Sequence, residues 1–280
     1  MKELKDGVAV VTGGASGIGR ALADRFAVEG MKVVIADVDQ EALAVAEAEM
    51  RANGASVASK RTDVRKGEDL EALARLAVDT FGGVNVLCNN AGIGIGGGIW
   101  QQTAQDWEWM LGVNLMGVVH GIRAFVPVMI AQADECHIVN TASAAGLTVR
   151  PFLGMYAATK HAVVALSEAL YHEVKFTGAK IGVSVLCPAV VNTRIGESER
   201  NRPAGLANDV GAGNPAQMAA MEQAFRAMLA TGLPPAEVAG AVVDSIRADR
   251  FYILTHEDTR ERVRSRMEDI LEGRNPTLTA

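Results

Sequence analysis

Short apolar runs alternate with amphipathic segments along this chain, and that alternation restricts the fold more than any other feature. The amphipathic segments carry apolar stripes at helical spacing, for example Leu43, Ala46 and Met50. A strand–helix–strand order calls for right-handed crossovers, which produce a parallel sheet with helices on both faces. The sequence therefore predicts an α/β fold with a three-layer, doubly wound, parallel seven-stranded sheet. The expected strands are Val8–Thr12, Lys32–Ala36, Ser56–Lys60, Asn85–Cys88, a run around His137–Val139, Ile181–Cys187 and Phe251–Thr255.

We expect one domain over residues 1–280, because the length suits it and no internal repeat or linker interrupts the alternation. An irregular segment at about 189–232 contains Gly, Asn and Pro residues, and we expect it to close over a bound ligand. Its apolar stripe is Met218, Met221, Phe225 and Met228, which suits either an apolar pocket or ordinary core packing. A further helix is expected at about 257–273, beyond the last strand.

Composition excludes several classes of protein. The net charge of −6 argues against a nucleic-acid partner. No uninterrupted apolar run reaches the ~18 residues of a membrane span, and the first strand begins too early for a signal peptide. The histidines and cysteines lack metal-ligand spacing, so we expect no metal. The three cysteines, Cys88, Cys136 and Cys187, fit buried, reduced thiols in a cytoplasmic protein. The expected partner is a small-molecule substrate.

A glycine-rich loop, TGGASGIG, follows the first expected strand and leads into an amphipathic helix. Glycines at these positions permit a tight turn, close approach of a pyrophosphate and close packing of helix on strand. The N–H groups at the start of the helix then face the phosphates. The loop thus suggests a dinucleotide site, although alone it would also fit a structural turn. The candidate cofactor contacts are Gly13, Ser16, Gly17, Ile18 and Gly19.

Asp37 ends the second expected strand, about twenty residues after the glycine loop, where an acidic residue can accept hydrogen bonds from an adenosine ribose. Its charge would repel a 2′-phosphate, and Val38 offers no compensating cation. Both features favour NAD over NADP. Asp37 could instead cap the next helix, but Asp39 serves that purpose equally well.

The stretch Asn140–Lys160 contains Ser143 after a strand, then Tyr156 and Lys160 on a helix. Residues four apart share one helix face. A tyrosine normally ionises near pH ~10. A nearby ammonium lowers that pKa toward the range that general acid–base catalysis requires. Ser143 can donate a hydrogen bond to a substrate oxygen. The alternative is an ordinary pair of side chains on a helix surface.

These motifs, taken in order, resemble the short-chain dehydrogenase/reductase family of Rossmann-fold enzymes, over roughly Gly7 to Tyr252. The resemblance rests on TGGASGIG, Asp37, the pair Asp63 and Val64, the NNAG segment at Asn89–Gly92, Ser143 and the YAATK segment.

The resemblance implies roles for further residues. It implies that Asp63 and Val64 contact adenine, and that Asn90, Ala91 and Gly92 flank the cofactor. It implies that Asn114 distorts its helix and holds a water linked to Lys160. Pro188, Val191 and Thr193 match the segment that contacts the nicotinamide carboxamide, with Ala189 in place of the usual glycine. Tyr156 and Lys160 are implied to contact the cofactor as well.

The function expected on this basis is NAD-dependent hydride transfer between the cofactor and a secondary alcohol or ketone. Apolar residues after Ser143 favour a bulky aromatic or alicyclic substrate. The alternatives are a non-catalytic dinucleotide-binding regulator, an NADP-dependent ketone reductase, and an isomerase or dehydratase, which would need a second domain. The apolar helices expected at Thr103–Ala131 and Gly154–Phe176 predict a homotetramer or homodimer.

Overall fold

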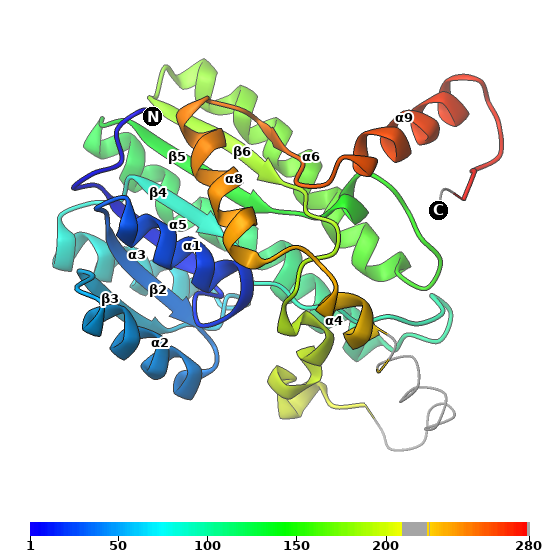
Figure 1. Ribbon diagram of the computed structural model, residues 1–280, viewed down its shortest axis with the longest axis horizontal. Coiled ribbons are helices and arrows are strands. Elements are labelled where there is room, and N and C mark those ends of the chain that lie inside the picture. Colours follow the sequence, from blue (N-terminus) through cyan, green and yellow to red (C-terminus); the bar gives the residue numbers. More distant parts are fainter. Residues whose placement is uncertain (209–222, 224, 279–280) are drawn as a thin grey trace.

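A computed structural model of the chain describes residues 1–208, 223 and 225–278 and confirms the predicted α/β fold. Seven parallel strands form one sheet in the order β3-β2-β1-β4-β5-β6-β7 (Figure 1). The strands are β1 Val8–Thr12, β2 Lys32–Asp37, β3 Val57–Arg61, β4 Val86–Asn89, β5 Cys136–Thr141, β6 Ile181–Leu186 and β7 Tyr252–Ile253. The main helices are α1 Gly17–Val28, α2 Gln40–Ala52, α3 Gly67–Phe81, α4 Ala104–Leu111, α5 Gly117–Gln132, α6 Gly154–Thr177, α8 Pro235–Arg247 and α9 Asp258–Leu271.

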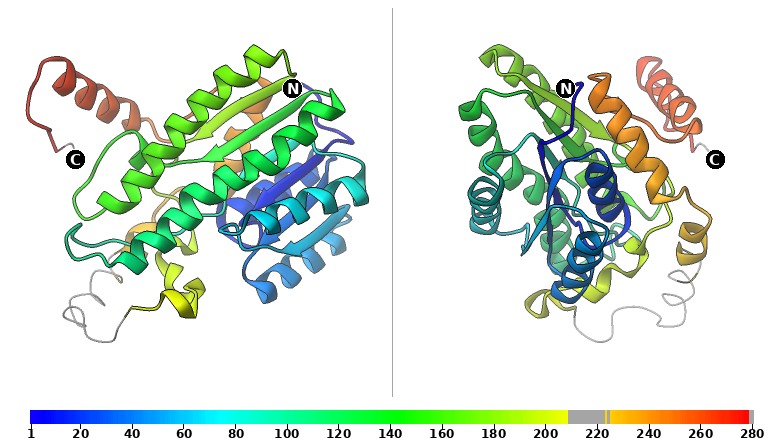
Figure 2. Two further views of the ribbon diagram at one scale, coloured as in Figure 1. Left: turned by 180° about the vertical axis from the view of Figure 1, so that it is seen from behind. Right: turned by 60° about the vertical axis from the view of Figure 1, so that its left-hand side comes forward.

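Helices cover both faces of the sheet, as the continuous burial of the central strands requires. Alternate side chains of each strand point to opposite faces. Val11 and Ile35 pack with α1, α2 and α8 in one apolar cluster, whereas Val10 and Val34 pack with α3, α5 and α6 in another. Figure 2 shows the second set of helices from behind. The two clusters make the sheet the middle layer of three.

The strand order reverses direction between β1 and β4, and this reversal locates the site. β1 pairs with β2 on one side and with β4 on the other. The crossovers that leave these neighbouring strands run to opposite faces, so a crevice opens at their carboxyl ends. Thr12, at the end of β1, and Asn89, at the end of β4, therefore border the crevice.

The long helix expected at Thr103–Ala131 is present, but one turn of it is a π-helix. α4 passes into π-helical residues Gly112–Met116 and then into α5. Such π turns occur mostly at functional sites. By length and composition alone, the helical stretch Ala104–Gln132 is long and apolar enough to cross a membrane. In this fold α5 packs through Phe125 and Met129 into the cluster beneath the sheet.

Beyond β6 the chain is irregular, as expected. Two 3₁₀ segments, η3 Arg194–Asn201 and η4 Ala204–Leu206, precede α8. Much of the segment expected at 189–232 lies outside the described residues, including Met218 and Met221. α9 follows β7 and stands apart from the three layers at the right of Figure 1. Ile270 and Leu271 on α9 are largely exposed.

Candidate active site

The glycine loop fits tightly between β1, α1 and the segment after β4. Gly13 and Gly17 adopt left-handed backbone conformations, with φ of 65° and 55°. A Cβ at Gly13 would lie 2.9 Å from the Cα of Ala91, and a Cβ at Gly19 would clash with the carbonyl oxygen of Gly13. Ser16 precedes α1 but its side chain does not cap the helix. The first N–H groups of α1 therefore keep their capacity to bind an anion.

Thr12 and Asn90 join the glycine loop to the NNAG segment. The Thr12 hydroxyl accepts hydrogen bonds from the N–H groups of Asn90 at 3.0 Å and Ala91 at 3.1 Å. The Asn90 amide donates in return to the Thr12 carbonyl at 3.0 Å. These reciprocal bonds fix both walls of the crevice relative to each other. Gly92 lies further along, where an added Cβ would be 3.5 Å from the Lys160 ammonium.

Asp37 is free of the capping role, because Asp39 caps α2 by accepting from the Ala42 N–H at 3.0 Å. The Asp37 carboxylate instead accepts from the N–H of Ala15 at 3.1 Å and from that of Asp39 at 3.1 Å. It therefore contacts the glycine loop itself. Burial raises the pKa of Asp37, and the neighbouring charge of Asp39 adds to that effect.

Asp63 and Val64, the residues matched to adenine contacts, follow β3. Burial disfavours the charged form of Asp63, but the ion pair with Arg65, at 2.6 Å, outweighs it and lowers the pKa of Asp63. Val64 is buried against Gly117 of α5, where an added Cβ would lie 2.9 Å from a Val64 methyl. Both residues are thus held in place by their neighbours.

Ser143, Tyr156 and Lys160 come together at the carboxyl ends of β5 and β6. Ser143 is buried, and its hydroxyl donates to the Pro188 carbonyl at 3.3 Å. Lys160 is buried on α6, and its ammonium donates to the Thr141 carbonyl at 2.9 Å. That ammonium lies 5.6 Å from the centre of the Tyr156 ring. The fold therefore places a hydroxyl, a phenol and an ammonium around one point.

The expected lowering of the Tyr156 pKa by Lys160 is not what the isolated chain shows. Burial raises the pKa of Tyr156 to about 12, against which a hydrogen bond with the Ser143 side chain acts. Burial likewise lowers the pKa of Lys160 to about 8. The physical reason is that both groups are withdrawn from water and the ammonium points at Thr141. Desolvation therefore dominates the Coulombic attraction.

Asn114 lies in the π-helical turn and is fully buried. Its amide oxygen accepts from the Ile93 N–H at 2.9 Å, and its amide nitrogen donates to the Ile93 carbonyl at 3.0 Å. The same nitrogen donates to the Thr159 hydroxyl at 3.3 Å. Asn114 thereby ties the segment after β4 to α6. The distortion of the helix at Asn114 agrees with what the family resemblance implied.

The segment after β6 brings Pro188, Val191 and Thr193 to the same crevice, and a residue that the sequence did not single out supports it. His256, after β7, accepts from the Ala189 N–H at 3.2 Å through Nδ1, and its Nε2 lies 3.0 Å from the Val190 carbonyl. Val191 is buried and Thr193 is the N-cap of η3. Local sequence offered no signal for His256, because the contact joins residues 66 apart.

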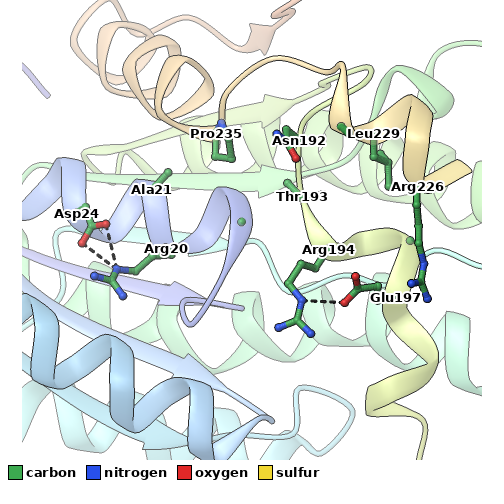
Figure 3. Close-up of a pocket in the computed structure, with 13 residues that line it drawn as sticks. Arg20, Ala21, Asp24, Asn192, Thr193, Arg194, Glu197, Arg226, Leu229 and Pro235 are labelled. Carbon is green, nitrogen blue, oxygen red and sulfur yellow. Dashed lines mark hydrogen bonds and ion pairs between the residues drawn. The ribbon is translucent and has the colours of Figure 1, made fainter. Parts of the chain in front are cut away.

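A pocket of about 450 Å³ opens beside the start of α1. Its walls include Gly17 and Arg20 on one side and Thr193 and Arg194 on the other (Figure 3). Arg194 pairs with Glu197 at 2.8 Å. Ser143, Tyr156 and Lys160 do not line this pocket. The pocket therefore adjoins the glycine-loop end of the crevice.

The fold and the site define a class of protein. A parallel sheet of this strand order, with a glycine-rich loop at its switch point, is the dinucleotide-binding Rossmann fold. The sequence pattern of the family described as short chain dehydrogenase matches residues 7–204. The chain belongs to this short-chain dehydrogenase family, and it is therefore an oxidoreductase of that family.

Solved and curated relatives span the whole chain. A short chain dehydrogenase/reductase from Burkholderia phymatum, solved in complex with NAD, is 47% identical with a TM-score of 0.96, covering 100% of this chain and 99% of the other. A 1-deoxy-11-beta-hydroxypentalenate dehydrogenase from Streptomyces exfoliatus is 36% identical, covering 95% of this chain and 89% of that one. A C alpha-dehydrogenase from Sphingobium sp. strain SYK-6 is 34% identical, covering 99% and 89%.

Proposed function

We propose that this protein is an NAD-dependent dehydrogenase that oxidises a bulky, apolar secondary alcohol to a ketone, and runs the reverse reaction when the ketone is supplied. The observation that carries the proposal is the convergence of Ser143, Tyr156 and Lys160 at the switch-point crevice, which the uncapped N-terminus of α1 borders at another point. Fold alone would not support an activity. The activity is supported instead by the reactive side chains that lie together at a dinucleotide-binding crevice.

The residues present fit NAD. The uncapped start of α1 offers N–H donors to a diphosphate, and Gly13, Ser16, Gly17, Ile18 and Gly19 form the turn around it. The Asp37 carboxylate, positioned by the Ala15 N–H, is placed to accept from the adenosine ribose. Asp63, Val64, Asn90, Ala91 and Gly92 border the adenine and ribose sides, while Pro188, Val191 and Thr193 border the nicotinamide side. When bound, NAD supplies the hydride acceptor.

Tyr156 is the proposed base. In its phenolate form Tyr156 takes the proton of the substrate alcohol and becomes the neutral phenol. Ser143 holds the substrate oxygen by a hydrogen bond that strengthens as charge develops there. Lys160 contributes a buried positive charge, and a positively charged nicotinamide adds to it. Together these charges offset the burial that raises the pKa of Tyr156 to about 12. Asn114 holds the chain beside Lys160. We expect the proton to pass from Tyr156 toward solvent by way of Lys160 and the polar groups around Asn114.

The wall around Tyr156 supports an apolar substrate. Tyr156 packs in a cluster with Ile93, Trp109, Met110 and Met155, to which Ile95 and Leu206 contribute. Outside this cluster the loops carry large exposed apolar side chains, namely Ile99, Trp100, Val149 and Phe152. An apolar alcohol gains free energy by covering such surface. Two of the relatives are dehydrogenases of a hydroxypentalenate and of a Cα position, and we infer a bulky alicyclic or aryl secondary alcohol here as well.

Turnover of an alcohol panel tests the proposal. Aryl and alicyclic secondary alcohols should reduce NAD to NADH, whereas short alcohols such as 2-propanol should give far smaller kcat/KM. The absence of turnover with every alcohol and ketone, in protein that binds NAD, would favour the regulator alternative instead.

We further propose that the protein works in the cytoplasm as a homotetramer or homodimer. The exposed apolar residues on the outer faces of α4, α5 and α6 support an interface between copies.

A further inference from the structure

The segment from Thr193 to Leu206, which we call the strap, crosses from one wall of the crevice to the other. At its start Thr193 packs against the glycine loop, where a Cβ on Gly17 would lie 3.2 Å from the Thr193 methyl. In its middle the buried Ser198 hydroxyl accepts from the Gly94 N–H at 3.0 Å. The strap thus touches both the segment after β1 and the segment after β4.

Arg202 anchors the far end of the strap to α4. Its guanidinium pairs with the Asp106 carboxylate at 2.7 Å, and the side chains of both residues are only 8% exposed. The guanidinium also lies over the Trp109 ring, 4.4 Å from the ring centre, and donates to the Leu206 carbonyl at 3.0 Å. A buried ion pair of this kind is costly to break, because it would leave one charge unpaired.

Asp106 is fixed independently of the strap. It forms a capping box with Thr103 at the start of α4, accepting from the Thr103 N–H at 3.0 Å. Burial disfavours its charged form, but the hydrogen bonds from Asn208 and Thr103 and the Arg202 charge together lower its pKa. Asp106 is therefore an ionised, rigid acceptor. Trp109 is equally rigid, since it is buried in the cluster that also contains Tyr156.

Apart from Leu206, which packs against the apolar cluster around Tyr156, the strap buries few side chains. Among the residues of η3 only Ser198 is buried, and η4 buries none. Short 3₁₀ segments with few buried apolar contacts belong to the least stable parts of a fold. Their position across the crevice therefore depends on a small number of polar contacts. The Arg202–Asp106 pair is the most buried ion pair among these contacts.

We propose that the Arg202–Asp106 ion pair is a positioning pair that holds the strap across the cofactor crevice and so sets the affinity for NAD. The inference rests on the proposed function, because NAD is the ligand whose binding it governs. Arg202 is not a catalytic residue, since it acts through the strap rather than on the reacting atoms. If NAD binding requires the strap in place, the apparent dissociation constant rises as the fraction of molecules in that state falls.

Calorimetric titration of NAD into four purified proteins tests this: wild type, Arg202→Met, Asp106→Asn and Glu199→Gln. Glu199 is the matched control, because it also pairs with Arg202, at 2.6 Å, but its side chain is 61% exposed. Arg202→Met and Asp106→Asn should weaken NAD binding by about 10-fold or more. Glu199→Gln should change it by less than about twofold, as exposed pairs contribute little. Arg202→Lys should not restore binding, since lysine lacks the planar fork that both pairs and stacks.

Steady-state kinetics give a second readout that general damage to the fold would not produce. The KM for NAD should rise in Arg202→Met by a larger factor than kcat falls, while near-ultraviolet circular dichroism stays that of wild type. Wild-type NAD affinity in a folded Arg202→Met protein overturns the proposal. If Arg202→Met does not fold, Ser198→Ala is the second variant, because it removes another contact of the strap. Weaker NAD binding in Ser198→Ala supports the proposal, and unchanged binding overturns it. Failure of the wild-type protein to bind NAD at all would instead overturn the proposed function.

Discussion

Lys160 and Tyr156 share one face of α6, yet the Lys160 ammonium donates its hydrogen bond to the Thr141 carbonyl, at 2.9 Å, and not to the tyrosine. The distance from that ammonium to the centre of the Tyr156 ring is 5.6 Å. Lys160 therefore holds the end of β5 and makes no direct hydrogen bond to the phenol. This arrangement determines what the variants of both residues should do.

Replacing Tyr156 with phenylalanine should abolish turnover while leaving NAD binding within a few-fold of wild type. The change removes only the hydroxyl, so the packing of the ring with Met155 and Trp109 remains. General acid–base catalysis contributes on the order of 10²–10⁴-fold, and kcat should fall by at least that factor. Stopped-flow measurement of NADH formation with saturating alcohol checks it. Near-normal turnover in folded Tyr156→Phe protein would show that another group is the base.

Lys160 predicts a particular dependence of stability on pH. Its pKa is lowered by burial to about 8 in the folded chain, from an unfolded value of 10.5. Between these values the unfolded chain binds more protons than the folded one, so the free energy of unfolding rises with pH. The gain from this group, on the order of 3 kcal/mol, is lost again as the pH falls through about 8.

Urea unfolding of wild type and Lys160→Met at pH 7, 8, 9 and 10 isolates that contribution. The difference in unfolding free energy between the two proteins should move in favour of wild type as the pH rises. Burial raises the pKa of Tyr156 from 10.0 to about 12. Tyr156 therefore lowers the free energy of unfolding as the pH rises, but only above pH 10. A difference that stays constant from pH 7 to pH 10 would contradict the depressed pKa of Lys160.

The preference for NAD over NADP should depend on the charge of Asp37. A 2′-phosphate would meet the Asp37 carboxylate, and like charges in contact cost several kcal/mol. NAD should therefore be preferred to NADP by at least ~100-fold in kcat/KM. Asp37→Ala combined with Val38→Arg should narrow or reverse this preference, as initial rates with both cofactors would show.

Two basic residues on the neighbouring strand, Lys60 and Arg61, could weaken the expected preference for NAD. Arg61 is the register partner of Asp37 in the adjacent strand β3, with Lys60 one residue before it. Efficient use of NADP by the wild-type enzyme would mean that one of these cations compensates for the carboxylate. Arg61→Ala should then restore discrimination, and in an NAD-selective enzyme it should change kcat/KM for NAD little.

Association of copies should depend on the outer face of the long helix α4–α5. Met116 and Ile130 are 38% and 44% exposed there, and Phe176 at the end of α6 is 91% exposed. Covering these side chains stabilises a symmetric assembly. Wild-type protein at micromolar concentration should sediment as a dimer or tetramer, and Ile130→Glu should shift it toward monomer. Val45→Glu, on the exposed side of α2, is the matched control and should leave the sedimentation of the protein unchanged.

The amino-acid sequence was enough to predict the sheet, the glycine loop and the candidate reactive side chains. These features are local: a run of buried residues, a turn that needs glycine at 13 and 17, and a four-residue spacing on α6. Asp39 as the cap of α2 was predicted for the same reason, since the capping bond spans only three residues.

Tertiary structure decided what depends on distant segments and on burial. The pKa directions of Tyr156 and Lys160 follow from withdrawal of both groups from water, which the spacing of two residues on a helix does not reveal. His256 supports the segment after β6 across 66 residues, and Arg202 reaches Asp106 across 96. Such contacts leave no periodic trace in the sequence, because each is made once, and only the packing of the whole chain brings the partners together.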